Sequence, residues 1–343
     1  MLVSRFRRVL FCTAFATLVA TIGSADRPLV YCLQGATVVP APDQLIEHGT
    51  VVLRDGLIEA VGDGITPPPD AVIIDGDNLW VYPGLIDVVT ILDKGAGQDG
   101  GPPSGSSGPS RAGADEASPG PVHPLSLVHP ENRASEALLP FEDDRKRRAE
   151  RLRELGFTTV LAVPTSGVFR GSSAAVLLKD EVPVSEIILR EDVAQHLGFE
   201  RESFGAGYPS SLMGAAATIR QVLLDTRRQE EWAQRYERDP KGMERPDFVA
   251  SFVALRELVA GDQKAIFHAD SANDVLLAAR IADEFQLDAA IEASGHEWEV
   301  VREIRQAGYT LILPLAPPEK PKVADDDEAL EASIRTMRRY LEA

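Results

Sequence analysis

The fold is decided by residues 265–292, which read AIFHADSANDVLLAARIADEFQLDAAIE. An apolar strand is predicted at Ala265–His268, a helix at Ala272–Phe285 and a second strand at Ala289–Glu292. Strands joined by a helix of this length pair in parallel through a right-handed crossover. This stretch is therefore one β-α-β unit of a parallel α/β architecture.

The same alternation of helices and strands continues on both sides of that unit. The further predicted elements are a charged helix at Glu142–Leu155 ended by Gly156, a strand at Thr158–Val163, helices at Ser210–Arg228, Asp247–Val259 and His296–Gln306, a strand at Thr310–Leu313, and a closing helix at about Asp325–Leu341. Ser210 or Ser211 is expected to cap its helix. The pattern favours a (β/α) barrel of the TIM type over residues 81–343.

The segment 26–80 has a different pattern, with short strands separated by turns. These strands are predicted at Ala36–Val39, Thr50–Leu53, Leu57–Val61 and Ala71–Ile74. Asp55-Gly56 is a hairpin signal, because this dipeptide readily adopts the positive backbone angles of a tight turn. We expect a small β-sandwich here. The apolar run Leu79–Leu92 that follows is expected to form a barrel strand buried on both faces.

The N-terminus has the features of a secretory signal peptide. Three arginines, Arg5, Arg7 and Arg8, precede an apolar run of 14 residues at Val9–Ile22, which small residues follow as far as Ala25. A membrane-spanning helix needs roughly 20 apolar residues, so a retained anchor is the weaker alternative. Cleavage after residue 25 predicts a periplasmic or secreted protein. It leaves Cys32 as the one remaining thiol, which excludes an internal disulfide.

The composition narrows the class of partner. Asp and Glu number 53 against 35 Lys and Arg, a formal net charge of −18. Nucleic-acid binding calls for a basic face, so we expect no nucleic-acid partner, and no stable membrane span after processing. Residues 94–121 are rich in Gly, Ser and Pro and predict a flexible loop, with an active-site lid as the alternative.

Several motifs together carry a resemblance to a known family. They are residues 51–62 (VVLRDGLIEAVG), 72–76 (VIIDG), 82–87 (YPGLID), 156–160 (GFTTV) and 267–271 (FHADS). In this order they resemble the amidohydrolase superfamily, in its imidazolonepropionase-like branch, over most of the mature chain. The resemblance implies a composite β-domain on a barrel that hydrolyses C–N bonds of small amides, ureas or lactams. It also implies a divalent ion such as zinc that activates water.

The sequence departs from the family pattern where a His-x-His pair of metal ligands is expected. Val89 and Ile91 occupy those two positions, and aliphatic side chains have no lone pair for a metal. The usual two-metal site is therefore incomplete. His268 matches the strand-five ligand and is the main candidate metal ligand; a hydrogen-bonded histidine without a metal is the alternative.

Two further residues are candidates at the same barrel mouth. His296 is a weaker metal candidate, because it lies beyond the strand-six position at a predicted helix start. Asp270 is the candidate catalytic acid or base, and Glu292 is a second carboxylate near the mouth.

The predicted barrel has fewer strands than a closed barrel needs. About five or six barrel strands are predicted from Tyr82 onward, whereas a closed barrel has eight. We therefore expect a barrel incomplete at its C-terminal end. Truncation of a longer protein is the favoured explanation; the alternatives are a homo-oligomeric or paralogous partner that completes the sheet, and a fold that is an open half-barrel. Two functions are left open, and the first is an exported hydrolase of a small cyclic amide that uses a reduced or displaced site around His268. The second is a noncatalytic binding or assembly subunit with the same fold.

Overall fold

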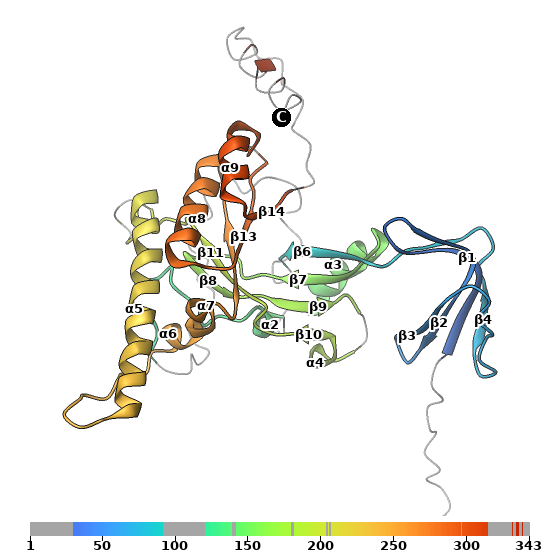
Figure 1. Ribbon diagram of the computed structural model, residues 1–343, viewed down its shortest axis with the longest axis horizontal. Coiled ribbons are helices and arrows are strands. Elements are labelled where there is room, and N and C mark those ends of the chain that lie inside the picture. The colour runs from blue at the N-terminus through green and yellow to red at the C-terminus, as the bar shows by residue number, and fades with distance from the viewer. Residues whose placement is uncertain are drawn as a thin grey trace, which may run out of the picture. The chain divides into compact units, whose positions relative to one another are not determined.

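The computed structural model divides into two units, Met1–Pro83 and Gly84–Ala343 (Figure 1). The residues that the structure describes are 30–91, 121–138, 142–179, 182–203, 205, 207–295, 297–314, 331, 334, 335 and 338. The predicted signal peptide lies outside the described residues, as do nearly all of the predicted loop at 94–121 and most of the predicted closing helix.

The first unit is built on one five-stranded sheet. Its strands are β1 (Val30–Ala41), β2 (Gln44–Arg54), β3 (Leu57–Gly62), β4 (Val72–Asp75) and β5 (Trp80–Val81). Their order is β3-β2-β1-β4, and β5 also pairs with β1. Asp55 and Gly56 have positive φ angles of 51° and 79°, which confirms the hairpin. The described strands form one layer, so the second layer of a sandwich stays a prediction.

The second unit begins with a four-stranded sheet in the order β10-β9-β7-β6. Its strands are β6 (Leu85–Thr90), β7 (Phe157–Ala162), β9 (Ala174–Leu177) and β10 (Ile188–Arg190). Along the chain, the helix α3 (Glu142–Glu154) follows β6 and precedes β7, and these two strands pair in parallel. The short helices α2 (Ala134–Ala137) and α4 (Val184–Ile187) also belong to this part of the chain.

The predicted burial of the strand after Tyr82 on both faces is wrong. β6 is the edge strand of its sheet among the described residues. Leu85, Ile86 and Val88 are 53%, 65% and 42% exposed. The apolar run is also interrupted, because Tyr82-Pro83-Gly84 separates β5 from β6. Continuous hydrophobicity identified the strand but not its neighbours.

The other sheet of the second unit has the order β14-β13-β12-β11-β8. Its strands are β8 (Phe169–Ser172), β11 (Ala194–Gly198), β12 (Lys264–His268), β13 (Ala289–Glu292) and β14 (Thr310–Ile312). β11 to β14 run parallel, and β8 is antiparallel to β11. The parallel α/β architecture predicted from the sequence is therefore present.

Helices connect these parallel strands. They are α5 (Leu212–Arg238), α6 (Ala250–Ala254) and α7 (Arg256–Ala260) between β11 and β12, α8 (Ala272–Phe285) between β12 and β13, and the 3₁₀ turn η1 (Glu297–Val300) with α9 (Val301–Ala307) before β14. In Figure 1, α5, α8 and α9 lie beside the sheet. Their apolar residues and the sheet form the largest buried cluster, which includes Phe267, Leu223 and Ile281.

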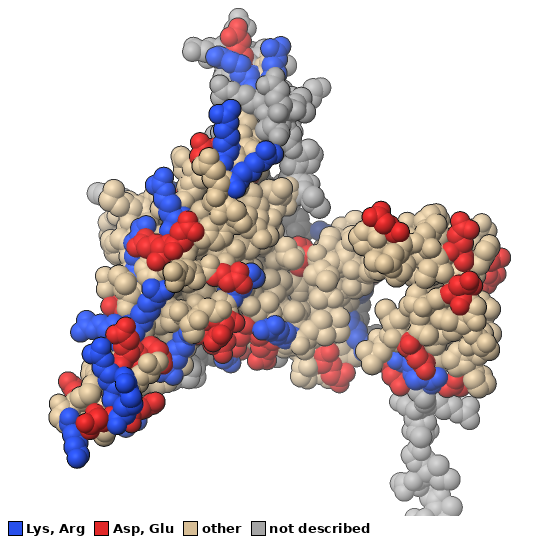
Figure 2. Space-filling model, in the orientation of Figure 1, with Lys and Arg blue, Asp and Glu red and all other residues tan. Residues whose placement is uncertain are grey.

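The predicted helix at Ser210–Arg228 continues for ten residues beyond its expected end, to Arg238. From Asp225 to Arg238 its exposed residues are polar, and Figure 2 shows Lys and Arg interspersed with Asp and Glu there. Ion pairs join Arg220 to Glu284 and Glu230 to Arg256. The predicted helix at Asp247–Val259 is instead two short helices, α6 and α7, that meet at Leu255.

The two sheets of the second unit share a small buried cluster. Ala194, Ile266 and Ala290 from β11 to β13 pack with Leu161 of β7 and Ile312 of β14. The described strands form two separate hydrogen-bonded sheets, so a closed eight-stranded barrel stays a prediction. No helix within the described ranges is long and apolar enough to cross a membrane.

Candidate functional site

Three parallel strands bring titratable side chains together near their carboxyl ends. His196 lies on β11, while His268 and Glu292 are the last residues of β12 and β13. His268 pairs in register with Glu292 on one side and with Gly198 on the other. The carboxyl ends of parallel strands are the edge at which α/β proteins place their reactive groups.

The three side chains share the sheet face that points away from the helices. Residues two positions apart on a strand lie on one face. The residues two positions earlier form the small buried cluster between the sheets: Ala194, Ile266 and Ala290. The adjacent strand residues belong to the core under the helices: Leu197, Phe267 and Ile291. The titratable groups therefore lie above an apolar layer between the sheets.

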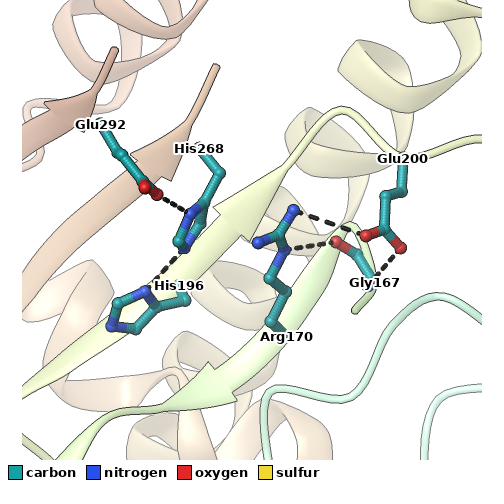
Figure 3. Close-up of polar contacts among 6 residues, drawn as sticks. All are labelled: Gly167, Arg170, His196, Glu200, His268 and Glu292. Carbon is teal, nitrogen blue, oxygen red and sulfur yellow. Dashed lines mark hydrogen bonds and ion pairs between the residues drawn. The ribbon is translucent and has the colours of Figure 1, made fainter. Parts of the chain in front are cut away.

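Hydrogen bonds link the three residues into a chain (Figure 3). Nδ1 of His196 lies 2.8 Å from Nε2 of His268, and Nδ1 of His268 contacts the Glu292 carboxylate. When Glu292 is ionised it accepts the Nδ1 proton of His268, and Nε2 of His268 then accepts the Nδ1 proton of His196. Nε2 of His196 is left as a lone pair, buried and without a hydrogen-bond partner.

Burial keeps both imidazoles neutral. His196 is fully buried and His268 is 8% exposed. Desolvation lowers the pKa of each well below its usual value, and the nearby positive charge of Arg170 lowers both pKa values further. In the contact between the two residues, the neutral ring of His268 therefore donates a hydrogen bond to the Glu292 carboxylate. Desolvation raises the pKa of Glu292, whose side chain is 32% exposed.

Arg170 on β8 places a cation beside this chain. Its side chain is 14% exposed, Nη2 lies 3.4 Å from Oε1 of Glu200, and Nε lies 3.4 Å from the carbonyl oxygen of Gly167. The other Glu200 oxygen accepts the backbone N–H of Gly167 at 2.6 Å. A Cβ at Gly198 would lie 2.9 Å from Nη2, so a glycine there leaves room for the guanidinium.

The site residues predicted from the sequence do not all lie in the hydrogen-bonded chain. His268 lies at the centre of the hydrogen-bonded chain. Asp270 is exposed, two residues beyond the end of β12, where its negative charge acts on Arg170. Its catalytic role stays a prediction. His296 lies outside the described residues. Val89 ends up half-buried on β6, and Ile91 follows that strand.

Two residues of the site were not identified from the sequence. His196 and Arg170 lie on β11 and β8, and neither strand was predicted. Both strands are short, and each includes a glycine and a polar residue within the run. A useful signal was present in the polar pair Gln195-His196 inside a short run that ends at Gly198, because a polar residue within a fully buried strand needs a partner.

The arrangement does not fit a divalent metal ion. In the ionised state of Glu292, both ring nitrogens of His268 take part in hydrogen bonds, so no lone pair of this ring is left for a metal. The buried Arg170 cation lies close enough to lower the pKa of both histidines. Within the part of the chain that the structure describes, no group of three or more His, Cys, Asp or Glu could hold an ion.

A surface cavity lies elsewhere in the second unit. Its volume is about 400 Å³, and its lining includes Ser135, Glu136, Ser185 and Arg190 from α2, α4 and β10. None of the site residues lines it. The site is therefore identified by its buried titratable groups and not by the volume of a cavity.

Comparison with known proteins shows a similarity of fold. No family model and no curated protein matches the sequence. The solved structure of an amidohydrolase from Thermotoga maritima is similar, with a TM-score of 0.66 and 21% identity over 91% of this chain and 76% of that one. A prolidase solved with N-methylphosphonate-L-proline has a TM-score of 0.42 and 14% identity, over 91% and 74% of the chains, which is too distant to support an argument. This chain is thus similar in fold to an amidohydrolase.

Proposed function

We propose that this chain is an exported hydrolase of the amidohydrolase type that cleaves the non-peptide C–N bond of a small, cyclic amide. One observation carries the proposal: Glu292, His268 and His196 form a hydrogen-bonded chain on one sheet face, near the carboxyl ends of adjacent parallel strands. The fold likeness to a solved amidohydrolase supports the reaction class.

The proposed reaction adds water across the amide. The water oxygen bonds to the carbonyl carbon, the C–N bond breaks, and a proton from the water passes to the leaving nitrogen. Glu292 is the proposed carrier of that proton, because its carboxylate is partly exposed and desolvation raises its pKa above the usual range of a carboxylic acid. His268 is the proposed positioning residue, because its neutral ring bonds the carboxylate and is itself fixed by His196.

The test compares matched variants of the full mature chain on a panel of small lactams, hydantoins and ureas. We expect Glu292→Gln to lose about 100-fold or more in kcat, the usual contribution of a general acid–base group. His268→Gln should change the pH profile of kcat as well as its size, because it removes the partner of the carboxylate. His48→Asn is the control, since His48 is exposed in the first unit at a positive φ that Asn tolerates.

Equal turnover in wild type and Glu292→Gln would refute the assignment of Glu292. A folded wild-type protein that binds panel compounds but hydrolyses none of them would favour a noncatalytic binding subunit instead.

Export rests on the N-terminal pattern of three arginines, an apolar run and small residues up to Ala25. We expect the mature protein to begin at Asp26. Expression in a Gram-negative host followed by N-terminal sequencing of the periplasmic fraction tests this. Recovery of the protein only in the cytoplasm with its arginine-rich N-terminus intact would contradict it.

A further inference from the structure

We propose that Arg170 binds the carbonyl oxygen of the substrate, and that the site accepts uncharged amides in preference to amides that carry a carboxylate. This inference rests on the proposed function and names its substrate class. It follows from the contacts of the guanidinium, from the charges around it and from the position of its remaining donor.

The guanidinium is enclosed but loosely held. Its two hydrogen bonds, to Gly167 and Glu200, are both 3.4 Å long, whereas N–H···O bonds are usually 2.7–3.2 Å. Nη1 has no hydrogen-bond partner among the described residues. In Figure 3 the guanidinium nitrogen without a dashed line lies on the side of His268. A ligand beside the histidines would therefore meet a free N–H donor.

The guanidinium of Arg170 is mostly buried but keeps one donor that is not enclosed by the protein. Desolvation is the largest influence on Arg170 and lowers its pKa. Buried charges are normally held by short charge-assisted hydrogen bonds. An oxygen acceptor on a ligand would give Nη1 a charge-assisted hydrogen bond, which no described oxygen of the protein supplies.

The surrounding charges decide between a carbonyl and a carboxylate ligand. Glu200, Glu292 and Asp270 all act on Arg170. Even without Glu292, whose pKa is raised, the carboxylates of Glu200 and Asp270 outnumber the single cation. A carboxylate on the ligand would add to an existing negative excess, whereas a carbonyl oxygen accepts a charge-assisted hydrogen bond and adds no charge.

This assignment also gives the buried cation a role in a site whose donors do not fit a metal ion. A guanidinium N–H aimed at a carbonyl oxygen stabilises the negative charge that develops there during attack by water. Arg170 would thus polarise the same bond that a metal ion polarises in metal-dependent hydrolases.

The test measures binding without turnover. The probes are N-acetylglycinamide and N-acetylglycine. They differ only at one end, where the first has a neutral amide and the second a carboxylate. Binding to the full mature chain is followed at pH 7 through the side-chain NMR resonances of His196 and His268. We expect wild type to bind N-acetylglycinamide about tenfold more tightly than N-acetylglycine. In Arg170→Gln the affinity for N-acetylglycinamide should fall by about tenfold.

Two further variants separate binding from structure. Glu200→Gln keeps an oxygen for the backbone N–H of Gly167 but removes one negative charge, so it should narrow the preference for the amide severalfold. Arg220→Lys, in an exposed ion pair with Glu284 on α5, should bind both probes as wild type does.

Tighter binding of N-acetylglycine, no binding of either probe to folded wild type, or an unchanged preference in Glu200→Gln would each overturn the inference. Failure of the proposed function is a different result, because it appears as absent hydrolysis in a protein that still prefers the uncharged probe.

Discussion

At the scale of single residues, the site concentrates groups that are costly to bury. Nε2 of His196 is enclosed without a partner, and a buried unsatisfied polar atom costs about 1–3 kcal/mol. His268 offsets part of this cost, because it bonds both His196 and Glu292. Such a group is retained most readily where a ligand or a proton uses it.

The burial of neutral histidines makes stability depend on pH. The pKa values of His196 and His268 are depressed in the folded state, so the unfolded chain binds more protons below about pH 6.5. The contribution of the two neutral rings to the free energy of unfolding is complete above that pH. It is lost as the pH falls, by up to about 1.4 kcal/mol per pH unit for each ring. Glu292 acts in the opposite direction, because its folded pKa is raised.

Urea unfolding between pH 7.5 and 5.5 measures this dependence. We expect His196→Gln to lose stability less steeply than wild type as the pH falls, since one titrating ring has gone. His48→Asn should keep the wild-type slope. The same slope in all three proteins would show that His196 does not titrate as its burial requires.

The close packing around Gly198 leads to a second prediction at this scale. An added Cβ would lie 2.9 Å from Nη2 and 3.1 Å from Nε of Arg170, and 3.2 Å from the carbonyl oxygen of Gly167. Gly198→Ala should therefore displace the guanidinium and cost about 1–3 kcal/mol by overpacking. Gly62→Ala is the control, because its Cβ would meet only the side chain of Ile65, nearest at the terminal carbon. Thermal unfolding compares them, and equal losses would contradict the prediction.

At the scale of elements, helix ends are fixed by specific side chains. Ser271 begins α8 by accepting the N–H of Asp274, and Ser211 begins α5 by accepting the N–H of Gly214. The apolar residues of α8 recur at helical spacing and face the core: Val275, Ala278, Ala279, Ala282 and Phe285. Both α8 and β13 therefore have the bounds that the sequence predicts.

The sequence left Ser210 and Ser211 as alternative caps of α5, and the structure assigns the cap to Ser211. Ser211→Ala should lower the free energy of unfolding by about 1 kcal/mol, because it leaves the N–H of Gly214 unpaired. Ser210→Ala, one residue outside the cap and exposed, should have little effect. Urea denaturation of the two variants decides this, and the reverse order of effects would place the helix start one residue earlier.

At the scale of the molecule, the second unit depends on one large core. This cluster joins β8, β11, β12 and β13 to α5, α7 and α8. Its residues are separated by up to about 160 positions in the chain, from Val128 to Ile291. The loss of one large side chain should therefore destabilise the whole unit and not a single helix.

Adjacent leucines on α5 test this. Leu223 is fully buried in the core and Leu224 is 52% exposed. Leu223→Ala should cost about 2–5 kcal/mol by leaving a cavity. Leu224→Ala should change stability by less than about 0.5 kcal/mol. Calorimetry of the full chain compares the two, and a similar loss in both would contradict the assignment of the core.

The sequence by itself determined the elements whose cause is local. Helical spacing and a capping serine define α8, the Asp-Gly turn defines the β2–β3 hairpin, and an apolar run ending in His268 defines β12. These features depend on residues within a few positions of each other, so the chain carries them without its partners.

Only the tertiary structure decided which residues meet. His196 and His268 are 72 positions apart, and Arg170 comes from an antiparallel strand too short to be identified alone. Burial on both faces of β6 was expected from its hydrophobicity, but that strand lies at a sheet edge. The reason is physical: strand order, and with it the contacts and burial of each side chain, is set by pairing between distant segments, and no local pattern encodes that pairing.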